Sequence, residues 1–322
     1  MPEYVLSLSY GKDSLACLGA IKHLGWPLDR IVHSEVWATD TIPADLPPMV
    51  EFKKKADAII KDRYGIEVEH ICALKTQGRA VANKHMNRCS TTNYQEENES
   101  EKSTGFLLTT SELGVKSSNK LTYEGLFYRT FQSGQRQGEI WGFPFQQGAW
   151  CQSRLKGRVL TNYLCSQTVQ VERERERETA EPQIVQYLGI AADEPSRIKR
   201  HINRPDIMLP LVEIGWKEDL CGLWSQYSDL LSPTYENACR NGCWFCHNQS
   251  VEQLRQLRRN YPDLWALLLK WDKDSPVTFK PDGTTVHDFD KRFHMEDEGI
   301  ILPNDRTFRW AQLNGNVQMK FF

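Results

Sequence analysis

Six consecutive residues near the start of the chain carry the groups that a phosphate site needs. They read Ser9-Tyr10-Gly11-Lys12-Asp13-Ser14 and stand between a short apolar run and an amphipathic segment. At a strand-to-helix turn, successive backbone N–H groups point at a ligand, and the helix dipole adds about half a positive charge. Gly11 allows the backbone to approach closely, and Lys12 adds a full positive charge. The loop therefore predicts a binding site for nucleotide phosphates.

The side chains of this loop offer further contacts to a triphosphate. Ser9 and Ser14 supply hydroxyl donors, and Asp13 can cap the helix or help to hold Mg²⁺. The simpler alternative is a turn in which these residues only cap a helix. The loop has neither the GxxxxGK[ST] form nor the GxGxxG form, which excludes the common NTPase and dinucleotide sites.

Three cysteines crowd together in the last third of the chain. They are Cys239, Cys243 and Cys246, in a Cx3Cx2C spacing that His247 follows directly. Thiolates this close favour a bound metal ion, which neutralises their charge. Three clustered cysteines with a distant fourth favour a [4Fe–4S] cluster over Zn²⁺, which two paired CxxC units would favour. The alternative is that the three are unrelated structural thiols.

The fourth ligand of such a centre is open among three residues. Cys221 stands just upstream and would make a compact structural staple, whereas Cys151 is more distant. His247 is a sound zinc ligand, although its adjacency to Cys246 strains the geometry. The spacing also matches the cluster loop of radical S-adenosylmethionine enzymes. Too few residues follow Cys246, however, for the barrel that carries that chemistry.

Strands and helices that must position these residues are expected to alternate over about the first 80 residues. Strands are expected at Tyr4–Ser9, Ile31–Val36 and Ile66–Ile71, and helices from Asp13 to Gly25 and over Met49–Tyr64. Glycines follow both helices, as is common at helix ends. Alternation of this kind predicts an α/β fold, in which helices cover a parallel sheet.

The rest of the chain is less regular. Polar residues dominate from about 90 to 137, which predicts a surface insertion that acts as a lid or partner contact. Val251–Trp271 predicts a leucine-rich helix that breaks near Pro262. We expect an α/β nucleotide domain over 1–215 that contains the insertion, and a mostly helical, metal-bearing region over 216–322.

The composition narrows the class of protein. With 322 residues, 40% hydrophobic and 25% charged, the chain suits one large or two modest globular domains. A formal charge of −2 indicates no general attraction to nucleic acid or membranes. No apolar run approaches the roughly 18 residues that span a bilayer, and no signal peptide is evident. We therefore expect a cytoplasmic protein with no membrane partner, whose nine cysteines serve as thiols and metal ligands.

The SxGKDS pattern after a first strand resembles the PP-loop of the ATP pyrophosphatases. The chain is most similar to their phosphoadenosine-phosphosulfate reductase-like branch, because further blocks occur in that family's order. These blocks are Thr39-Asp40-Thr41, Trp150-Cys151, Arg154-Leu155-Lys156, Gly189–Glu194 with Arg197, Pro210–Glu213 and Gly242–Cys246. The resemblance implies an open, doubly wound parallel sheet of the adenine nucleotide α-hydrolase-like type, with ATP at the carboxyl ends of its strands.

The resemblance also implies a role for each candidate residue. Ser9, Gly11, Lys12, Asp13 and Ser14 would hold the triphosphate. His33 and Ser34 would lie near the adenine and ribose, with Asp40 at the mouth. Lys156 and Arg197 would join Lys12 and Asp13 in catalysis by reaching the phosphates or the charge that develops at the α-phosphorus. The Trp150-Cys151 block would lie beside the nucleotide, which makes Cys151 the favoured fourth metal ligand.

One departure from the family decides the expected activity. True sulfonucleotide reductases carry a catalytic cysteine in a C-terminal Glu-Cys-Gly-Leu-His tail, whereas no cysteine follows Cys246 here. We therefore expect an adenylating enzyme rather than a reductase. It would convert ATP to AMP and pyrophosphate, activate a nucleotide or nucleic-acid substrate for sulfur transfer, and accept sulfur from a donor protein.

The rival hypothesis is a nucleic-acid-binding module without catalysis that uses a metal knuckle. Ten tryptophans could stack on bases, and the basic residues Arg255, Arg258 and Arg259 could meet phosphates. Tryptophan is ordinarily a core residue, however, and these arginines alternate with leucines as on any amphipathic helix. Release of pyrophosphate from ATP would distinguish an enzyme from a binding module.

Overall fold

The computed structural model describes residues 2–75, 119–144, 149–165, 184–236, 242–303, 305 and 308–310, and the backbone of 105–108. The chain forms two compact units. Unit 1 comprises Met1–Tyr123 and Cys151–Asn241, and unit 2 comprises Glu124–Trp150 and Gly242–Phe322.

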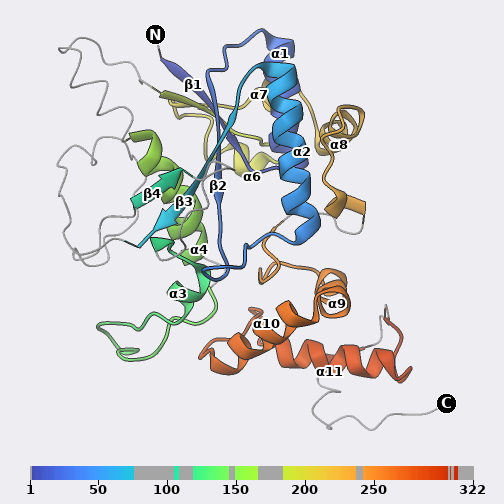
Figure 1. Cartoon of the computed structure of the whole chain (residues 1–322). Helices are drawn as coiled ribbons and strands as arrows, with labels where there is room; N and C mark the ends of the chain where they lie inside the picture. Colours follow the sequence, from blue (N-terminus) through green and yellow to red (C-terminus); the bar gives the residue numbers. More distant parts are fainter. Residues whose placement is uncertain are drawn as a thin grey trace. The chain divides into compact units, whose positions relative to one another are not determined.

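Unit 1 is built on one sheet, whose strands run in the order β4-β3-β2-β1-β5-β6 (Figure 1). The strands are β1 (Glu3–Leu8), β2 (Arg30–Glu35), β3 (Val68–Leu74), β4 (Gly105–Leu108), β5 (Ile184–Tyr187) and β6 (Ile207–Met208). All neighbours pair in parallel except β4, which joins β3 in the antiparallel sense. The predicted α/β class with a parallel sheet is confirmed, and the arrangement is compatible with Rossmann-like folds.

The first two helices begin and end where local sequence directs. Helix α1 (Lys12–Leu24) ends at Gly25, and α2 (Pro47–Tyr64) ends at Gly65. Both glycines adopt the left-handed conformation, with φ of 64° and 70°, which suits residues without a Cβ. Apolar side chains of α1 and α2 are buried in one cluster with residues of β1, β2 and β5. The expected strands and helices of this region are therefore present within a few residues.

The opposite face of the sheet is covered by the helical segment 150–165, which contains α4 (Trp150–Gln152) and a π-helical turn, η3 (Ser153–Gly157). Leu155 is buried there, and its carbonyl accepts a hydrogen bond from the Ser34 hydroxyl (3.3 Å). Tyr163 Oη donates to Glu69 of β3. Helices therefore cover both faces of the parallel sheet.

The predicted polar insertion is not a plain surface excursion. Residues 105–108 form the edge strand β4, and Tyr123–Phe127 forms helix α3. Tyr123 and Phe127 are buried, because these apolar residues interrupt the polar stretch and pack inside. Residues 90–104 and 109–118, on which a lid would depend, lie outside the described residues.

Residues beyond 215 continue unit 1, so the compact units divide differently from the expected boundary at 215/216. The segment contains α8 (Glu218–Tyr227) and the 3₁₀ turn η4 (Pro233–Glu236), after α6 (Pro195–Ile198) and α7 (Pro210–Glu213). Helix α8 packs on α1. A Cβ on Gly19 would lie 2.3 Å from the Trp224 indole nitrogen, so the two helices meet closely at this glycine.

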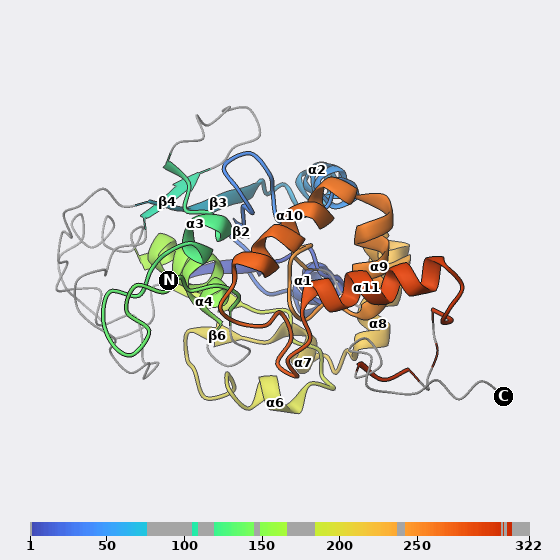
Figure 2. The same cartoon turned by 90° about the horizontal axis from the view of Figure 1, so that it is seen from below.

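Unit 2 carries three helices that pack on one another, α9 (Val251–Asn260), α10 (Pro262–Asp274) and α11 (Val286–Asp297) (Figure 2). Pro262 begins α10, which confirms the predicted break. Capping boxes begin α9 at Ser250 and α11 at Thr285. The core is aromatic and includes Phe127, Phe143, Trp244, Trp271, Phe279, Phe289 and Phe293.

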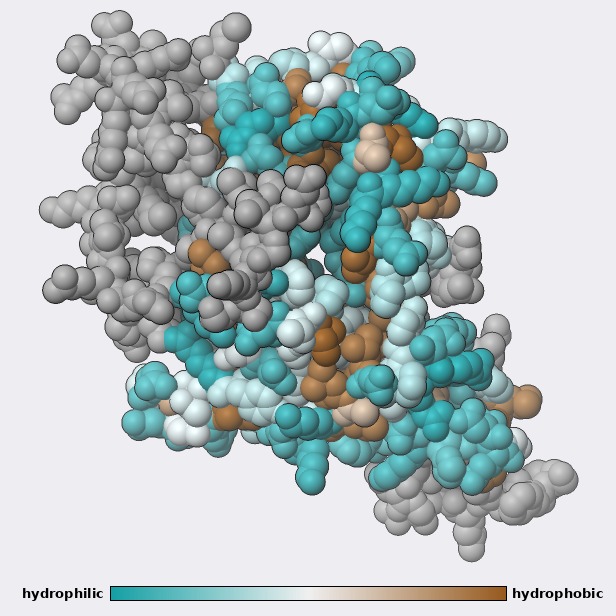
Figure 3. Space-filling model, viewed as in Figure 1, coloured by the Kyte–Doolittle hydropathy of each residue, from teal (hydrophilic) through white to brown (hydrophobic). Residues whose placement is uncertain are grey.

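The face of the molecule that Figure 3 draws is mostly polar where its residues are described. Figure 3 shows hydrophilic residues over most of the face that it draws, with smaller hydrophobic areas among them. No helix in the described ranges is long and apolar enough to cross a membrane.

Candidate functional site

The loop Ser9–Ser14 lies at the point where the strand order reverses. From β1 the chain moves to β2 and β3 on one side, while β5 pairs with β1 on the other. Ligands of open α/β sheets bind at the carboxyl ends of the strands next to such a switch point. The loop follows β1, and the segment from Leu188 follows β5, so both begin at this edge.

The loop is held by its own hydroxyl groups. Ser14 Oγ donates to the Gly11 carbonyl (3.0 Å) and accepts from both the backbone N–H (3.2 Å) and the hydroxyl (3.0 Å) of Ser9. Gly11 is the N-cap of α1, and no side chain caps the helix there. The N-terminus of α1 therefore keeps amide groups that a phosphate could meet.

Tyr10 has a left-handed backbone, with a φ of 55°, which costs a non-glycine residue about 1–2 kcal/mol. Its side chain is fully buried, and its hydroxyl donates to Asp57 and contacts His70 Nε2 (3.1 Å). Burial of this large ring offsets the backbone strain and anchors the loop to the sheet.

Gly189 brings the segment after β5 against the loop. A Cβ at this position would lie 2.6 Å from Ser14 Cα, 2.7 Å from Ser14 N and 2.9 Å from the Asp13 carbonyl carbon. All three are backbone atoms, so no side chain fits without moving the loop. Gly189 is therefore required for the two segments of the switch point to pack together.

Lys12 is bonded through each of its polar groups to the segment 218–236. Its N–H donates to Tyr235 Oη (3.2 Å), and its carbonyl accepts from Ser225 Oγ (3.1 Å). Its ammonium group pairs with Glu218 (2.6 Å). Glu218 is 57% exposed and can turn to solvent, whereas the Lys12 side chain is 16% exposed. A phosphate at the loop would take the places of Glu218 and Tyr235.

Asp13 carries an unsatisfied oxygen. Its Oδ1 is buried with no hydrogen-bond partner in the described part of the chain. Burial raises the pKa of Asp13 to about 6; Lys12 opposes this rise, and repulsion from Glu194 adds to it. A buried carboxylate oxygen beside further carboxylates fits a bound cation such as Mg²⁺.

Arg197 also belongs to this region, because its charge acts on Asp13. It pairs with both oxygens of Glu194, each at 2.7 Å, and its side chain is 45% exposed. The structure thus brings Arg197, from α6, together with Lys12 and Asp13 at the switch point.

His33 lies in β2, and its imidazole ring is enclosed by the protein. It is buried, with Nδ1 bonded to the Leu8 carbonyl (2.8 Å) and Nε2 to Lys53 Nζ (2.8 Å). Burial lowers the pKa of His33 well below its ordinary value, and the Lys53 charge lowers it further. Both ring nitrogens are used inside the protein, so a nucleotide could bond to His33 only by displacing one of them.

His70 is the cross-strand neighbour of His33, and its pKa is shifted in the opposite direction. Burial alone would lower its pKa, but hydrogen bonds to Asp57 (3.0 Å) and Glu35 (2.9 Å) outweigh burial and raise it to about 9. His70 is therefore charged at neutral pH and ties α2 to the sheet beneath Tyr10.

This raised pKa predicts a pH dependence of stability. Since the folded-state pKa exceeds the ordinary 6.5, the contribution of His70 is full below about pH 6.5 and is lost as pH rises through 9. We expect the free energy of unfolding in urea to fall between pH 6.5 and 8.5 by about 1–2 kcal/mol more in the wild type than in His70→Gln. Parallel pH profiles of the two proteins would contradict this assignment.

The remaining predicted residues lie farther along the sheet edge. Ser34 is bonded to Leu155, and the charge of Lys156 acts on His33, so both are near the end of β2. Asp40 pairs instead with Lys75 (3.6 Å), which follows β3.

Cys243 and Cys246 of the cysteine motif lie in a tight turn of unit 2. Cys246 N–H donates to the Cys243 carbonyl (3.0 Å), which also accepts from the Gln249 side chain (2.9 Å). Lys280 Nζ donates to the carbonyls of His247 (2.5 Å) and Gln249 (2.6 Å). Between the cysteines, Trp244 stacks on Trp271, with ring centroids 5.5 Å apart. The turn is thus anchored in the aromatic core.

The proposed metal centre is only partly described. Cys239 lies outside the described residues, and the described ranges contain no group of three His, Cys, Asp or Glu residues that could hold a metal. Cys151 belongs to α4 in unit 1. Cys221 is buried near Cys17 where α8 meets α1, and burial raises its pKa to about 12 in the metal-free protein.

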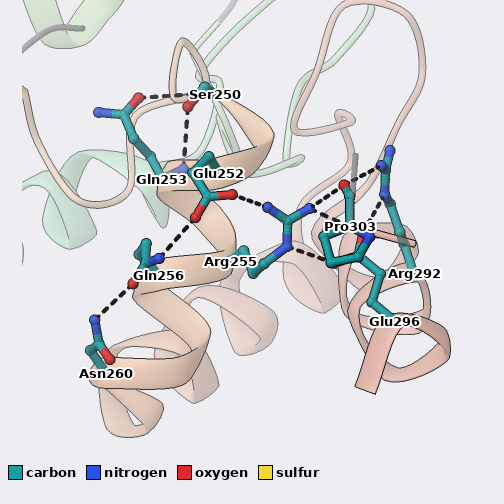
Figure 4. A network of polar contacts seen from close by, with 9 residues as sticks. All are labelled: Ser250, Glu252, Gln253, Arg255, Gln256, Asn260, Arg292, Glu296 and Pro303. Atoms are coloured by element: carbon teal, nitrogen blue, oxygen red, sulfur yellow. Dashed lines mark hydrogen bonds and ion pairs between the residues drawn. The ribbon is translucent and has the colours of Figure 1, made fainter. Parts of the chain in front are cut away.

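Two of the three arginines of α9, Arg255 and Arg258, are already paired with carboxylates. Figure 4 shows Arg255 between Glu252 and Glu296, with a further bond to the Pro303 carbonyl (2.9 Å). The Arg255 side chain is 7% exposed. Arg258 pairs with Asp290 (3.0 Å) and Asp297 (2.5 Å). These two charges are neutralised within unit 2, which removes the support that they lent to nucleic-acid binding.

The fold and the loop define an α/β protein whose candidate site lies at the switch point of a parallel sheet. Comparisons with protein-family models, curated proteins and solved structures gave no match.

The roles of several residues at the site could not be predicted from the sequence. Tyr10 occupies the variable position of the loop motif, and Glu218 and Tyr235 lie more than 200 residues from Lys12. No spacing rule connects positions so far apart, so only the fold could reveal these contacts.

Proposed function

We propose that the chain is an ATP-dependent adenylating enzyme of the PP-loop type. It binds ATP at Ser9–Ser14, cleaves it between the α and β phosphates, and activates a nucleotide or nucleic-acid substrate, with sulfur transfer as the favoured outcome. The observation that carries the proposal is the position of this loop, between β1 and α1 at the switch point of a parallel sheet.

The groups around the loop suit a magnesium-bound triphosphate. Lys12 and the α1 amides supply positive charge, but Asp13 and Glu218 are carboxylates in the same region. Bare phosphates would be repelled by these carboxylates, whereas Mg²⁺ would be held by the buried oxygen of Asp13 and would screen the repulsion. When bound, Mg²⁺ supplies charge neutralisation to the phosphate oxygens.

The reaction balances without a redox partner. An oxygen of the substrate attacks the α-phosphorus, the bond to the β-phosphate oxygen breaks, and pyrophosphate leaves with the electron pair. A sulfur or nitrogen nucleophile then displaces AMP from the adenylated substrate. Lys12 would neutralise the leaving pyrophosphate, and Arg197 would leave Glu194 to meet the charge at the α-phosphorus.

Product analysis tests this proposal. Purified protein, ATP labelled at the α-phosphate and a substrate-containing cell extract should yield labelled AMP and an equal amount of pyrophosphate. Heat-inactivated protein with the same extract provides the background rate. ADP and inorganic phosphate as the only products above background would overturn the proposal.

The cysteine turn of Cys243 and Cys246, with Cys239, is proposed to hold a [4Fe–4S] cluster, and Zn²⁺ is the alternative. The two described cysteines share one anchored turn, which suits adjacent ligands of one centre. Cys151 remains the preferred fourth ligand, as the family resemblance implies, and Cys221 is the next candidate. Three protein ligands alone would leave one iron open to a sulfur donor.

Metal analysis should give a large, all-or-none result. We expect anaerobically purified protein to contain iron and acid-labile sulfide in similar amounts, and Cys243→Ser with Cys246→Ser to remove both. Cys165→Ser, outside the motif, is the matched control and should keep them. Zinc without sulfide would assign the alternative metal, and Cys151→Ser against Cys221→Ser identifies the fourth ligand. Full folding and activity after replacement of all three clustered cysteines would rule out the centre.

A further inference from the structure

Lys120 places an ammonium group inside unit 1, at the carboxyl edge of the sheet. Its backbone forms an isolated antiparallel bridge with Leu74, the last residue of β3, whose partner on the other side is Gly105 of β4. Lys120 therefore lies on the β2 side of β3, beyond the end of β2. A Leu121 N–H bond to the Ala73 carbonyl (2.8 Å) holds the segment in place.

The side chain of Lys120 is almost buried but has no anionic partner. The residue is 5% exposed, and within the described ranges no carboxylate pairs with it and no acceptor bonds to Nζ. Its contact is the face of Trp37, with Nζ 3.1 Å from the ring centroid. An indole face attracts a cation but offers no conventional hydrogen-bond acceptor to its N–H groups. Burial of a charge in this way is costly unless a partner is supplied.

Trp37 also carries a buried hydrogen-bond donor without an acceptor in the described part of the chain. Its indole Nε1–H is buried and also lacks a hydrogen-bond partner among the residues that the structure describes. The backbone around it is fixed, because the Trp37 carbonyl accepts from the Tyr123 N–H (2.8 Å) and the residue bridges to Pro43. Two neighbouring side chains thus present donors without acceptors, at the edge where α/β sheets bind ligands.

We infer that Lys120 and Trp37 form a binding site for an anionic oxygen group such as a phosphate. Neighbouring strands lie about 4.8 Å apart, so a point beyond β2 is about one strand spacing from the end of β1 and its loop. That position is within reach of a phosphate of the nucleotide or of an anionic group on the second substrate. The assignment of the anion to the nucleotide or to the second substrate rests on the proposed function. The existence of an anion site at Lys120 and Trp37 does not depend on that function.

The effect of Lys120 on stability distinguishes a binding role of this residue from a structural role. A buried charge kept for a ligand destabilises the free protein, as is common at functional sites. Lys120→Met keeps most of the length and the apolar stem of the side chain but removes the charge. We expect it to unfold at a higher urea concentration than the wild type. A lower midpoint would mean that the charge stabilises the fold, which would overturn the inference.

Binding of inorganic phosphate, measured by calorimetry at low ionic strength, tests the site directly. The measurement is made in a Lys12→Ala background, which weakens phosphate binding at the loop. We expect Lys120→Met to weaken the remaining binding at least about tenfold, the effect of losing one charge-assisted contact. Trp37→Phe removes the Nε1–H and shortens the ring system but keeps an aromatic face, and it should weaken binding about threefold.

Lys75→Met is the matched control. Lys75 also follows β3, but it is 44% exposed and already pairs with Asp40, so its loss should change phosphate affinity less than twofold. An equal loss for Lys75→Met and Lys120→Met, or no loss for Lys120→Met, would refute the site.

Two further titrations assign the source of the anion. If Lys120→Met in the otherwise unaltered chain weakens binding of ATP, the site holds a phosphate of the nucleotide. If ATP binding is unchanged but phosphate binding in the presence of saturating ATP is weakened, the site holds an anionic group of the second substrate. Failure of the wild type to bind ATP would count against the proposed function alone, because the phosphate titrations remain valid.

Discussion

Replacing Lys12 by alanine is expected to slow the release of pyrophosphate from ATP by about 30- to 1,000-fold, which corresponds to about 2–4 kcal/mol of transition-state stabilisation. Lys12 is the cation of the loop Ser9–Ser14, and its side chain, 16% exposed, lies at the N-terminus of α1. A cation so placed is preorganised to meet the charge of the leaving pyrophosphate. The measurement is the single-turnover rate with labelled ATP and substrate-containing extract.

The same substitution should leave the fold nearly intact. Glu218, the ion-pair partner of Lys12, is 57% exposed and remains hydrated when Lys12 is replaced. The free energy of unfolding should therefore change by less than about 1 kcal/mol. Lys22→Ala removes another lysine of α1, in its last turn, and is the control for charge and helix effects. A rate loss of similar size in Lys22→Ala, or none in Lys12→Ala, would show that the loop does not act on phosphates.

The second large effect is expected from Gly189→Ala. The added Cβ would lie 2.6 Å from Ser14 Cα and 2.7 Å from Ser14 N, so the loop or the segment after β5 must move. Overpacking of this kind costs about 1–3 kcal/mol of the free energy of unfolding. Because the displaced atoms belong to the phosphate loop, we also expect ATP affinity to fall by about tenfold or more. Urea unfolding and ATP calorimetry measure the two effects.

Gly222→Ala is the matched control for this substitution. Gly222 lies inside α8, where the nearest atom to an added Cβ is Lys12 Cδ at 4.0 Å. Alanine is favoured over glycine within a helix by about 1 kcal/mol, so this variant should be as stable as the wild type or more so. Unchanged stability and ATP affinity in Gly189→Ala would mean that the close packing at the switch point is not required.

The local pattern of the sequence was enough to predict the first half of the sheet. Hydrophobic alternation and two helix-ending glycines located β1, α1, β2, α2 and β3 within a few residues, because these signals act between residues close along the chain. For the same reason Pro262 marked the start of α10. The loop Ser9–Ser14 could be proposed as a phosphate site from the sequence because the groups that such a site needs occupy consecutive positions at a strand-to-helix turn.

Contacts between distant residues were decided only by the tertiary structure. The pairing of β5 with β1 created the switch point. It also placed Gly189 against Ser14, although 175 positions of the sequence separate the two residues. Burial converted His33 from an expected nucleotide contact into a residue whose ring nitrogens are both bonded inside the protein. It likewise enclosed Arg255 among carboxylates.

The physical reason is that periodicity predicts which face of an element is buried but not what will cover it. Lys120 stands in a polar stretch that predicted a surface insertion, yet the structure buries it against Trp37. Desolvation and charge pairing depend on neighbours that the fold brings from elsewhere in the chain. Sequence alone therefore determined the order of the first elements and the candidate loop Ser9–Ser14, while the tertiary structure decided which charges are paired and which have no partner among the described residues.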